Sequence, residues 1–339
     1  MCYRFLMGAA FLTGWGSFLP DGWVTSADLD EAHGLERGTV FRASGIEARP
    51  LAGPDDNQVA MAAEAGRRAL ARANLTPDDI DLILFGGAVG YQPIPATAPF
   101  VKAALGVVSD APAYDVNATC LGALVALDQA ALQIAAGRVR RVLVVASEIA
   151  SRALPWPDAP EIAGLFGDGA GAWVVTDAPG EDTSFEVGPL ALRTRAEGVD
   201  HCTLRSGGTR IDRKAEPEAF VAGAAFAMDG RALYRLSTAA VPGVIDEALA
   251  HREWDRASLD LIVPHQASPG ALGWLERRCG FAEGRVWNQV AKTGNLVAAS
   301  LPVALERALE TGGTTAGDRV LLIGTSAGVS IGALTLEAL

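Results

Sequence analysis

The chain has 339 residues, 50% of them hydrophobic, and a formal net charge of −12. This length allows a large core in about two domain-sized units, and an acidic chain without a clustered Lys/Arg stripe is not expected to bind nucleic acid. The four cysteines lie far apart without a CxxC pair. They argue against a disulfide scaffold and a structural zinc site, and they favour a reducing, cytoplasmic location.

The first segment, residues 1–22, has one Arg followed by a short apolar run. Gly14 and Gly16 interrupt this run, and no clean cleavage site follows it. We therefore interpret the segment as the region of the first β-strand rather than as a signal peptide. No run of about 18 apolar residues occurs anywhere, so we expect no membrane span.

Short β-branched apolar runs alternate with longer Ala-rich runs along the rest of the chain. This pattern is typical of a buried, mostly parallel sheet that is covered by helices. The expected strands are residues 81–89, 140–148, 171–177, 260–268, 318–328 and 332–338. The expected helices are residues 59–73, 121–136, 233–250 and 298–309.

Three segments of the first half recur in the same order in the second half. They pair "NLTPDDIDLILFGGAV" with "EWDRASLDLIVPHQAS", "RRVLVVASEIA" with "DRVLLIGTSAG", and "GAGAWVVTD" with "AGVSIGALTLE". We infer two similar α/β halves, residues 1–180 and 181–339, joined near the Pro/Gly/acidic stretch at 178–182. The alternative is that any two α/β units resemble each other.

Cys120 lies between the expected strand "PAYDVNAT" and the expected helix 121–136. A helix N-terminus favours the thiolate and lowers the pKa of a thiol, and a thiolate takes an acyl group from a thioester. Asn117 and Thr119 can supply capping oxygens. A small, buried, inert cysteine is the other interpretation.

His265 stands at the end of the expected strand 260–268, where sites form in α/β sheets. Its imidazole handles protons near neutral pH, although a structural or surface role is also open. Asn295 lies further along, at an expected strand–turn–helix junction, where it acts as a candidate site residue or as a cap. The small residues 324–330 either bring backbone N–H groups to a reacting oxygen or form a tight hairpin.

The order of Cys120, then "PHQA", then "GN" resembles the thiolase-fold condensing enzymes, and within them the β-ketoacyl-[acyl-carrier-protein] synthase III group. The resemblance covers nearly the whole chain, from "FLTGWGSFLP" through "LFGDGAGAWVV" to "RVLLIGTSAGVSIGALTL". It implies an α/β thiolase fold with five αβαβα layers and an internal duplication. The first half would carry the nucleophilic Cys, and the second half would carry the His and the Asn. Family members are usually homodimers.

The resemblance also implies a reaction, in fatty-acid-like or polyketide and specialised biosynthesis. Cys120 would be acylated by an acyl-CoA or an acyl carrier protein, and malonyl-CoA or malonyl carrier protein would then lose CO₂. His265 and Asn295 would donate hydrogen bonds to the enolate, and the backbone N–H groups of Cys120 and Ala327 would hold the oxyanion. No metal or redox cofactor is implied.

The sequence departs from the family at the surface positions that receive the substrate carrier. Many members have a Trp and an Arg that sandwich the adenine of coenzyme A, but residues 36–43 read "ERGTVFRA", without Trp and with Arg42 displaced by one position. Arg277 and Arg278 match a basic pair that docks the carrier protein, while Gly270 replaces another patch residue. The alternative for the pair is a solvated helix end.

Two other functions remain open at this point. The first is a non-condensing acyl transfer from Cys120 to a hydroxyl, amine or thiol acceptor, with His265 as the base. Asn295 argues against it, because simple transfer needs no enolate stabiliser. The second is a non-enzymatic partner of an active paralogue, which the intact triad argues against.

Overall fold

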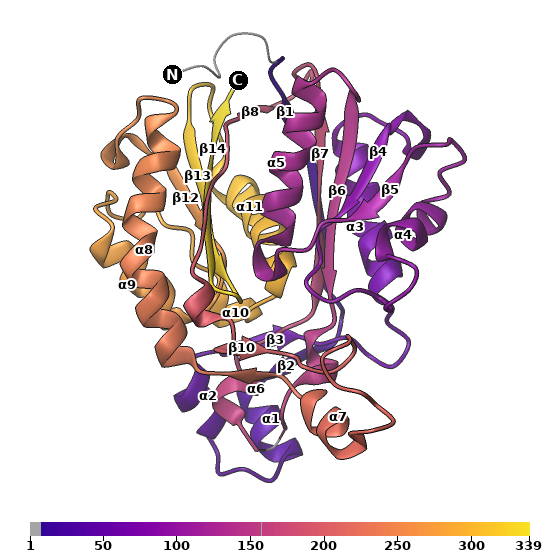
Figure 1. The fold of residues 1–339 in the computed structure, drawn as a ribbon. Coiled ribbons are helices and arrows are strands. Elements are labelled where there is room, and N and C mark those ends of the chain that lie inside the picture. The colour runs from indigo at the N-terminus through magenta and orange to yellow at the C-terminus, as the bar shows by residue number, and fades with distance from the viewer. Residues whose placement is uncertain (1–7, 157) are drawn as a thin grey trace.

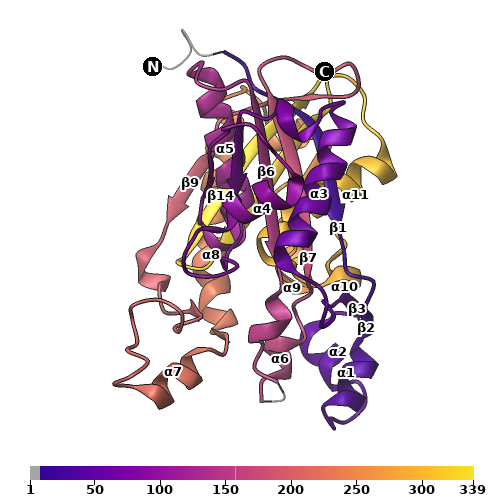
Figure 2. The same ribbon diagram turned by 90° about the vertical axis from the view of Figure 1, so that its right-hand side faces the viewer.

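The computed structural model describes residues 8–156 and 158–339, in which helices and strands alternate in layers (Figures 1 and 2). A ten-stranded sheet runs in the order β12-β13-β14-β8-β1-β7-β6-β4-β5, and β9 pairs with β14. The first strand group comprises β1 (Phe11–Phe18), β4 (Leu82–Phe85), β5 (Ala113–Asp115), β6 (Arg141–Glu148) and β7 (Gly169–Thr176). The second comprises β9 (Ala191–Thr194), β12 (Leu261–Pro264), β13 (Arg319–Ser326) and β14 (Ser330–Ala338). Strand β8 (Phe185–Val187) joins the groups by pairing with β1 and β14.

Helices cover both faces of each strand group (Figure 1). The outer face of the first group carries α3 (Gln58–Arg72) and α4 (Thr97–Leu105). Between the groups lie α5 (Gly122–Ala135) and α11 (Ser300–Gly312), and the outer face of the second group carries α8 (Gly230–Ala250) and α9 (Pro269–Arg278). The result is the predicted order of helix, sheet, helix, sheet and helix layers.

Shorter elements complete the described chain, most of them at the end drawn lowest in Figure 1. They are β2 (Trp23–Thr25), α1 (Ser26–Ala32), α2 (Thr39–Ser44), β3 (Ala48–Pro50), α6 (Pro160–Ala163), β10 (Cys202–Thr203), α7 (Pro217–Gly223), β11 (Ala227–Met228) and α10 (Val290–Thr293). Six 3-10 helices are η1 (Pro77–Asp79), η2 (Thr119–Leu121), η3 (Ala150–Ala153), η4 (Ala196–Gly198), η5 (Arg256–Ser258) and η6 (Val297–Ala299).

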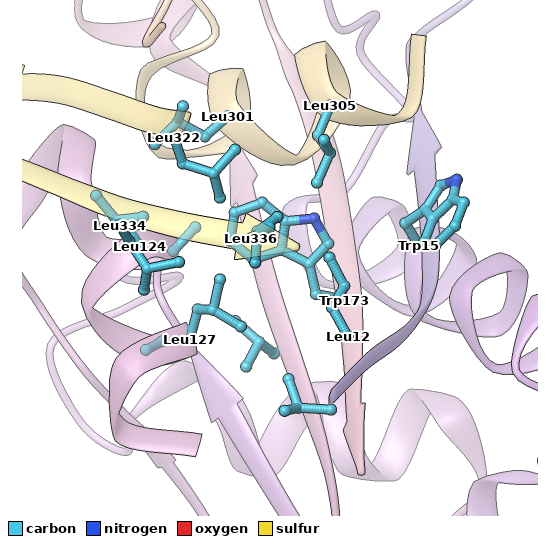
Figure 3. Close-up of a cluster of buried hydrophobic side chains, with 14 of the residues drawn as sticks. Leu12, Trp15, Leu124, Leu127, Trp173, Leu301, Leu305, Leu322, Leu334 and Leu336 are labelled. Atoms are coloured by element: carbon cyan, nitrogen blue, oxygen red, sulfur yellow. The ribbon is translucent and has the colours of Figure 1, made fainter. Parts of the chain in front are cut away.

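The apolar runs of the sequence are strands buried on both faces. In β4, Leu82 and Leu84 pack into the core around α5 and α11, whereas Ile83 and Phe85 pack under α3. Successive side chains of a strand point to opposite faces, so a strand between two helix layers has no polar face. Figure 3 shows the middle core, where leucines of α5 and α11 surround Trp173 and Leu336.

The prediction of a mostly parallel sheet is wrong. Strand β4 is parallel to β5 and β6, and β12 is parallel to β13. However, β7 is antiparallel to β1 and β6, and β14 is antiparallel to β13. An unbroken apolar run indicates that helices cover both faces of a strand. Such burial is common in parallel sheets, but an antiparallel strand between two helix layers has the same pattern. The small residues 324–330 form the tight hairpin between β13 and β14, which was one of the two predictions for them.

The expected internal duplication is visible in hydrogen bonds that join corresponding strands. At the start of β4 and β6, the Asp81 N–H donates to the Arg141 carbonyl (2.9 Å), and the Arg141 N–H donates to the Asp81 carboxylate (2.9 Å). At the start of β12 and β13, Asp260 and Arg319 make the same two bonds (2.9 and 3.0 Å). The boundary at 180 falls between β7 and β8 and stays a prediction.

The expected elements are found with shifted ends. All four expected helices are present, and β1 confirms the first strand, although residues 1–7 of that segment lie outside the described residues. The strands expected at 81–89 and 260–268 end early, at Phe85 and Pro264, because the chain turns out of the sheet there. None of the helices in residues 8–156 and 158–339 is long and apolar enough to span a membrane.

Candidate active site

A cavity of about 1260 Å³ brings together the predicted site residues of the two halves. The first half contributes Cys120, and the second contributes His265, Asn295 and Ala327. Residues 88–93 and 202–210 also line the cavity. These four residues are far apart in the sequence, and the fold brings them to the same cavity.

Cys120 is held in a tight turn at the start of α5. The side-chain oxygen of Asn117 accepts the Thr119 N–H (2.9 Å), and Thr119 adopts a positive φ of 50°. A Cβ atom at Gly122 would collide with the Gly86 carbonyl oxygen, so this turn presses closely against the end of β4. A non-glycine residue at positive φ stores strain, which the surrounding contacts must sustain.

The thiol of Cys120 is not activated by its helix. Burial raises the pKa of the Cys120 thiol to about 12, and Cys202 and Glu148 act in the same direction. The backbone N–H groups of Ala327 and Cys120 interact with the sulfur and lower the pKa only in part. The prediction of a lowered pKa is wrong, because desolvation exceeds the effect of these two N–H groups. Cys120 is a thiol at neutral pH and needs a base to react.

His265 follows β12 and is 4% exposed. Burial lowers the pKa of its imidazole to about 4, so the ring is neutral at pH 7 and can accept a proton. A Cβ atom at Gly324 would lie 2.8 Å from the His265 Cβ and 2.8 Å from a methyl carbon of Leu121. Glycine in β13 therefore lets His265 and the Cys120 turn approach the same point of the sheet.

Asn295 follows the short helix α10 and precedes η6. The preceding strand that we expected is absent from the described chain, where a single bridge to Phe166 takes its place. The Asn295 side-chain oxygen accepts the Val297 N–H (2.8 Å), and its amide nitrogen donates to the Ala267 carbonyl (3.3 Å). This orients the amide and leaves one of its two N–H groups for a ligand.

The predicted docking residues lie outside the cavity. Arg277 and Arg278 are exposed at the end of α9, whose inner residues Leu272 and Trp274 line the cavity. Arg42 is exposed on α2, with its guanidinium 3.8 Å from the Glu36 carboxylate. None of these arginines belongs to the described lining of the cavity. Their docking roles stay predictions.

Sequence reasoning missed several polar residues of the cavity. Glu148, the last residue of β6, lines it, and a charged residue ending an apolar strand was an available signal. Cys202 also lines it, and burial raises the pKa of this thiol to about 11. Arg152, Arg205 and Arg210 line it with exposed side chains. Among the described residues, no group of three or more His, Cys, Asp or Glu side chains is placed to hold a metal ion.

The raised pKa of Cys120 leads to a testable result. We expect iodoacetamide to alkylate Cys120 more slowly at pH 7 than it alkylates a free cysteine, whose pKa is about 8.5. The rate should still be rising at pH 10, because the thiolate fraction keeps growing toward the pKa near 12. Peptide mass spectrometry of the Cys120 peptide measures the rate, and a plateau below pH 8 would contradict the buried neutral thiol.

Two family models match the chain. The description "3-Oxoacyl-[acyl-carrier-protein (ACP)] synthase III" matches residues 114–196, and its C-terminal counterpart matches residues 249–338. The first match contains Cys120, and the second contains His265, Asn295 and Ala327. The four predicted site residues thus lie within the matched segments.

Relatives and solved structures match along almost the full chain. A β-ketoacyl-[acyl-carrier-protein] synthase III of Streptomyces coelicolor is 36% identical over 329 residues, 97% of each chain. The enzyme of that name from Acidiphilium cryptum is 32% identical and covers 98% of this chain and 100% of its own.

Among solved structures, the 3-oxoacyl-[acyl-carrier-protein] synthase III of Aquifex aeolicus has a TM-score of 0.84 at 29% identity, covering 97% of this chain and 99% of its own. The priming β-ketosynthase of a polyketide biosynthetic pathway has a TM-score of 0.85 at 29% identity, covering 99% and 98%. The chain thus combines this sequence identity over its full length with the predicted layers and with a cavity that is lined by residues of both halves. The chain therefore belongs to the β-ketoacyl-[acyl-carrier-protein] synthase III family of condensing acyltransferases.

Proposed function

We propose that Cys120, His265 and Asn295 catalyse a decarboxylative Claisen condensation in two half-reactions. The observation that supports this most directly is their common cavity, in which the N–H groups of Cys120 and Ala327 also reach the Cys120 sulfur. The two half-reactions use different sets of these side chains and N–H groups.

In the first half-reaction Cys120 takes the acyl group of a primer thioester. The neutral imidazole of His265 accepts the thiol proton as the sulfur attacks the thioester carbonyl, whose oxygen becomes negative between the N–H groups of Cys120 and Ala327. The tetrahedral intermediate collapses, the carrier thiolate leaves, and it takes the proton back from His265. The lowered pKa of His265 keeps the ring neutral and able to accept a proton, whereas the raised pKa of Cys120 keeps the sulfur protonated in the resting site. Both shifts oppose proton transfer before the attack, so the proton moves to His265 as the C–S bond forms.

In the second half-reaction a malonyl thioester loses CO₂. The electrons of its C–C bond move into the thioester carbonyl, and the enolate oxygen accepts hydrogen bonds from His265 and Asn295. The enolate carbon attacks the acyl-Cys120 carbonyl, a new C–C bond forms, and the Cys120 thiolate leaves. The thiolate takes up one proton from solvent, which balances the charge of the malonyl carboxylate that was lost as CO₂. No metal or redox cofactor takes part. Direct acyl transfer to another acceptor is not favoured, because it makes no use of Asn295.

The carrier and the assembly form a finer part of the proposal. We infer that the donor is an acyl carrier protein that contacts Arg277 and Arg278, since both are exposed beside the cavity-lining helix α9. The position expected for a Trp that stacks on adenine has none, and Arg42 pairs with Glu36. We further infer a homodimer, because Val89, Tyr91 and Ile94 expose apolar side chains beside the cavity. The four widely spaced cysteines without a CxxC pair support a cytoplasmic location.

A panel of acyl thioesters, each on coenzyme A and on a carrier protein, tests this function by intact-protein mass spectrometry. We expect one acyl mass increment that maps to Cys120, faster with the carrier protein than with coenzyme A. Added malonyl carrier protein should then remove the increment and release CO₂. Acyl transfer to an added amine or alcohol without CO₂ release would instead identify the non-condensing reaction.

A further inference from the structure

The proposed mechanism leaves one buried acid of the cavity without a role. Glu148 ends β6, is 2% exposed and lines the same cavity as Cys120 and Asn295. A buried carboxyl group needs hydrogen-bond donors around it. The donors that surround Glu148 indicate what it does.

Backbone N–H groups from two separate segments meet at the Glu148 carboxyl. The Ala88 N–H donates to one oxygen at 2.6 Å, and the Val89 N–H also reaches the group. Helix η6, from the other half of the chain, packs against β6, and the Ala298 N–H on η6 interacts with the Glu148 carboxyl. Glu148 therefore links the 88–89 loop to the segment that follows Asn295.

The Asn295 turn repeats the Cys120 turn of the first half. The Asn117 amide donates to the Ala88 carbonyl (3.0 Å), as Asn295 donates to Ala267 (3.3 Å). Each Asn oxygen accepts the N–H two residues later, from Thr119 or Val297, whose φ angles are 50° and 51°. This places Ala298 at the position of Cys120 in the repeated turn.

The repetition explains why a carboxyl group is found there. In the first half, the N–H at this position belongs to Cys120 and reaches the reacting sulfur. In the second half, the corresponding N–H belongs to Ala298, which carries no reacting side chain, and the Glu148 carboxyl accepts this N–H. The strained Val297 backbone lies between Asn295 and this anchor, so the anchor supports the conformation that orients the Asn295 amide.

We propose that Glu148 is a positioning residue that holds the Asn295 turn in place through the Ala298 N–H, and so orients the Asn295 amide toward the enolate. This rests on the proposed function of Asn295. Glu148 itself forms no bond to the substrate. Its removal should therefore impair the decarboxylation step more than acylation of Cys120.

The charge of Glu148 adds a pH dependence. Burial raises the pKa of Glu148 to about 8, with a small contribution from Asp168, so the group is neutral below pH 8 and negative above it. Cys120 on η2 is the other titratable group that interacts with Glu148, and the 88–89 loop and η6 contribute N–H groups. A negative charge here opposes the developing thiolate and enolate. Activity should fall above about pH 8.

One variant and one control test the proposal. Glu148→Ala should lower malonyl thioester decarboxylation about ten- to hundredfold, as expected for a misplaced catalytic group, while Cys120 acylation changes less than about threefold. The control is Asp128→Asn, a half-buried carboxyl group on α5 that accepts the Leu190 N–H (3.3 Å) and lies outside the described lining of the cavity. It should leave the ratio of the two rates unchanged. Equal losses of both rates in Glu148→Ala, or no loss, would overturn the proposal.

Two further readouts keep the test decisive. Hydrogen exchange of the 295–298 peptide should be faster in Glu148→Ala than in wild type or Asp128→Asn, and this holds whether or not the wild type decarboxylates malonyl thioesters. Unchanged exchange overturns the positioning role, whereas an inactive wild type overturns only the proposed function. If Glu148→Ala does not fold, Glu148→Gln, which keeps an acceptor oxygen, should remain active and lose the decline above pH 8. A retained decline would contradict the pH dependence assigned to Glu148.

Discussion

Replacement of Cys120 by Ala is expected to abolish acyl loading and condensation, with a loss of about 10⁴-fold or more in kcat/KM. The reason is that the proposed acyl-enzyme intermediate has its only covalent bond at this sulfur. His265 and the N–H groups of Cys120 and Ala327 can still polarise a bound thioester, but they cannot accept its acyl group. The assay is transfer of a radiolabelled acyl group to the protein, followed by peptide mapping.

Cys202 provides the matched control for this prediction. It lines the same cavity, and burial raises the pKa of its thiol as it does for Cys120. Cys202→Ala should therefore keep acyl loading within about threefold of wild type, because the N–H groups that would hold the oxyanion, those of Cys120 and Ala327, interact with the Cys120 sulfur. If the label persists in Cys120→Ala and disappears in Cys202→Ala, the nucleophile is Cys202 and our assignment of Cys120 is wrong.

Replacement of Asn295 by Ala is expected to slow CO₂ release from a malonyl thioester about 10²- to 10³-fold, the usual effect of removing one donor to a developing oxyanion. Acylation of Cys120 should remain, because the Asn295 amide is not among the groups that reach the sulfur. Release of labelled CO₂ and acyl loading, measured on the same preparation, separate the two half-reactions.

Asn117 is the matched control on the other side of the repeat. It makes the same two side-chain hydrogen bonds as Asn295, but its turn carries Cys120. Asn117→Ala should therefore slow acylation more than decarboxylation, which is the reverse of Asn295→Ala. If both variants lower both rates by the same factor, the two turns have no separate roles and the assignment of Asn295 to the enolate is wrong.

Much of the fold and of the site could be predicted because the relevant patterns are local. Apolar runs predicted the buried strands, Ala-rich runs predicted the helices, and ordered matches predicted the repeat that the Asp81–Arg141 and Asp260–Arg319 bonds display. The spacing of Cys120, His265 and Asn295 resembled one family, and the cavity contains all three residues. Each of these inferences depends only on the order of residues along the chain.

Other properties depend on what surrounds a residue after folding. Strand direction could not be predicted, because β7 and β14 are as apolar as the parallel strands. The pKa of Cys120 was predicted in the wrong direction, since a helix start is visible in the sequence and desolvation is not. Glu148 was overlooked because its partners Ala88 and Ala298 come from distant segments.

The sequence by itself thus determined the layers, the repeat and the order of the site residues, because periodicity and motif spacing are carried along the chain. Only the tertiary structure decided the direction of the strands, the protonation of Cys120 and His265, and the entry of Glu148 and Cys202 into the cavity. These follow from burial and from contacts between the two halves, which exist only when the chain is folded.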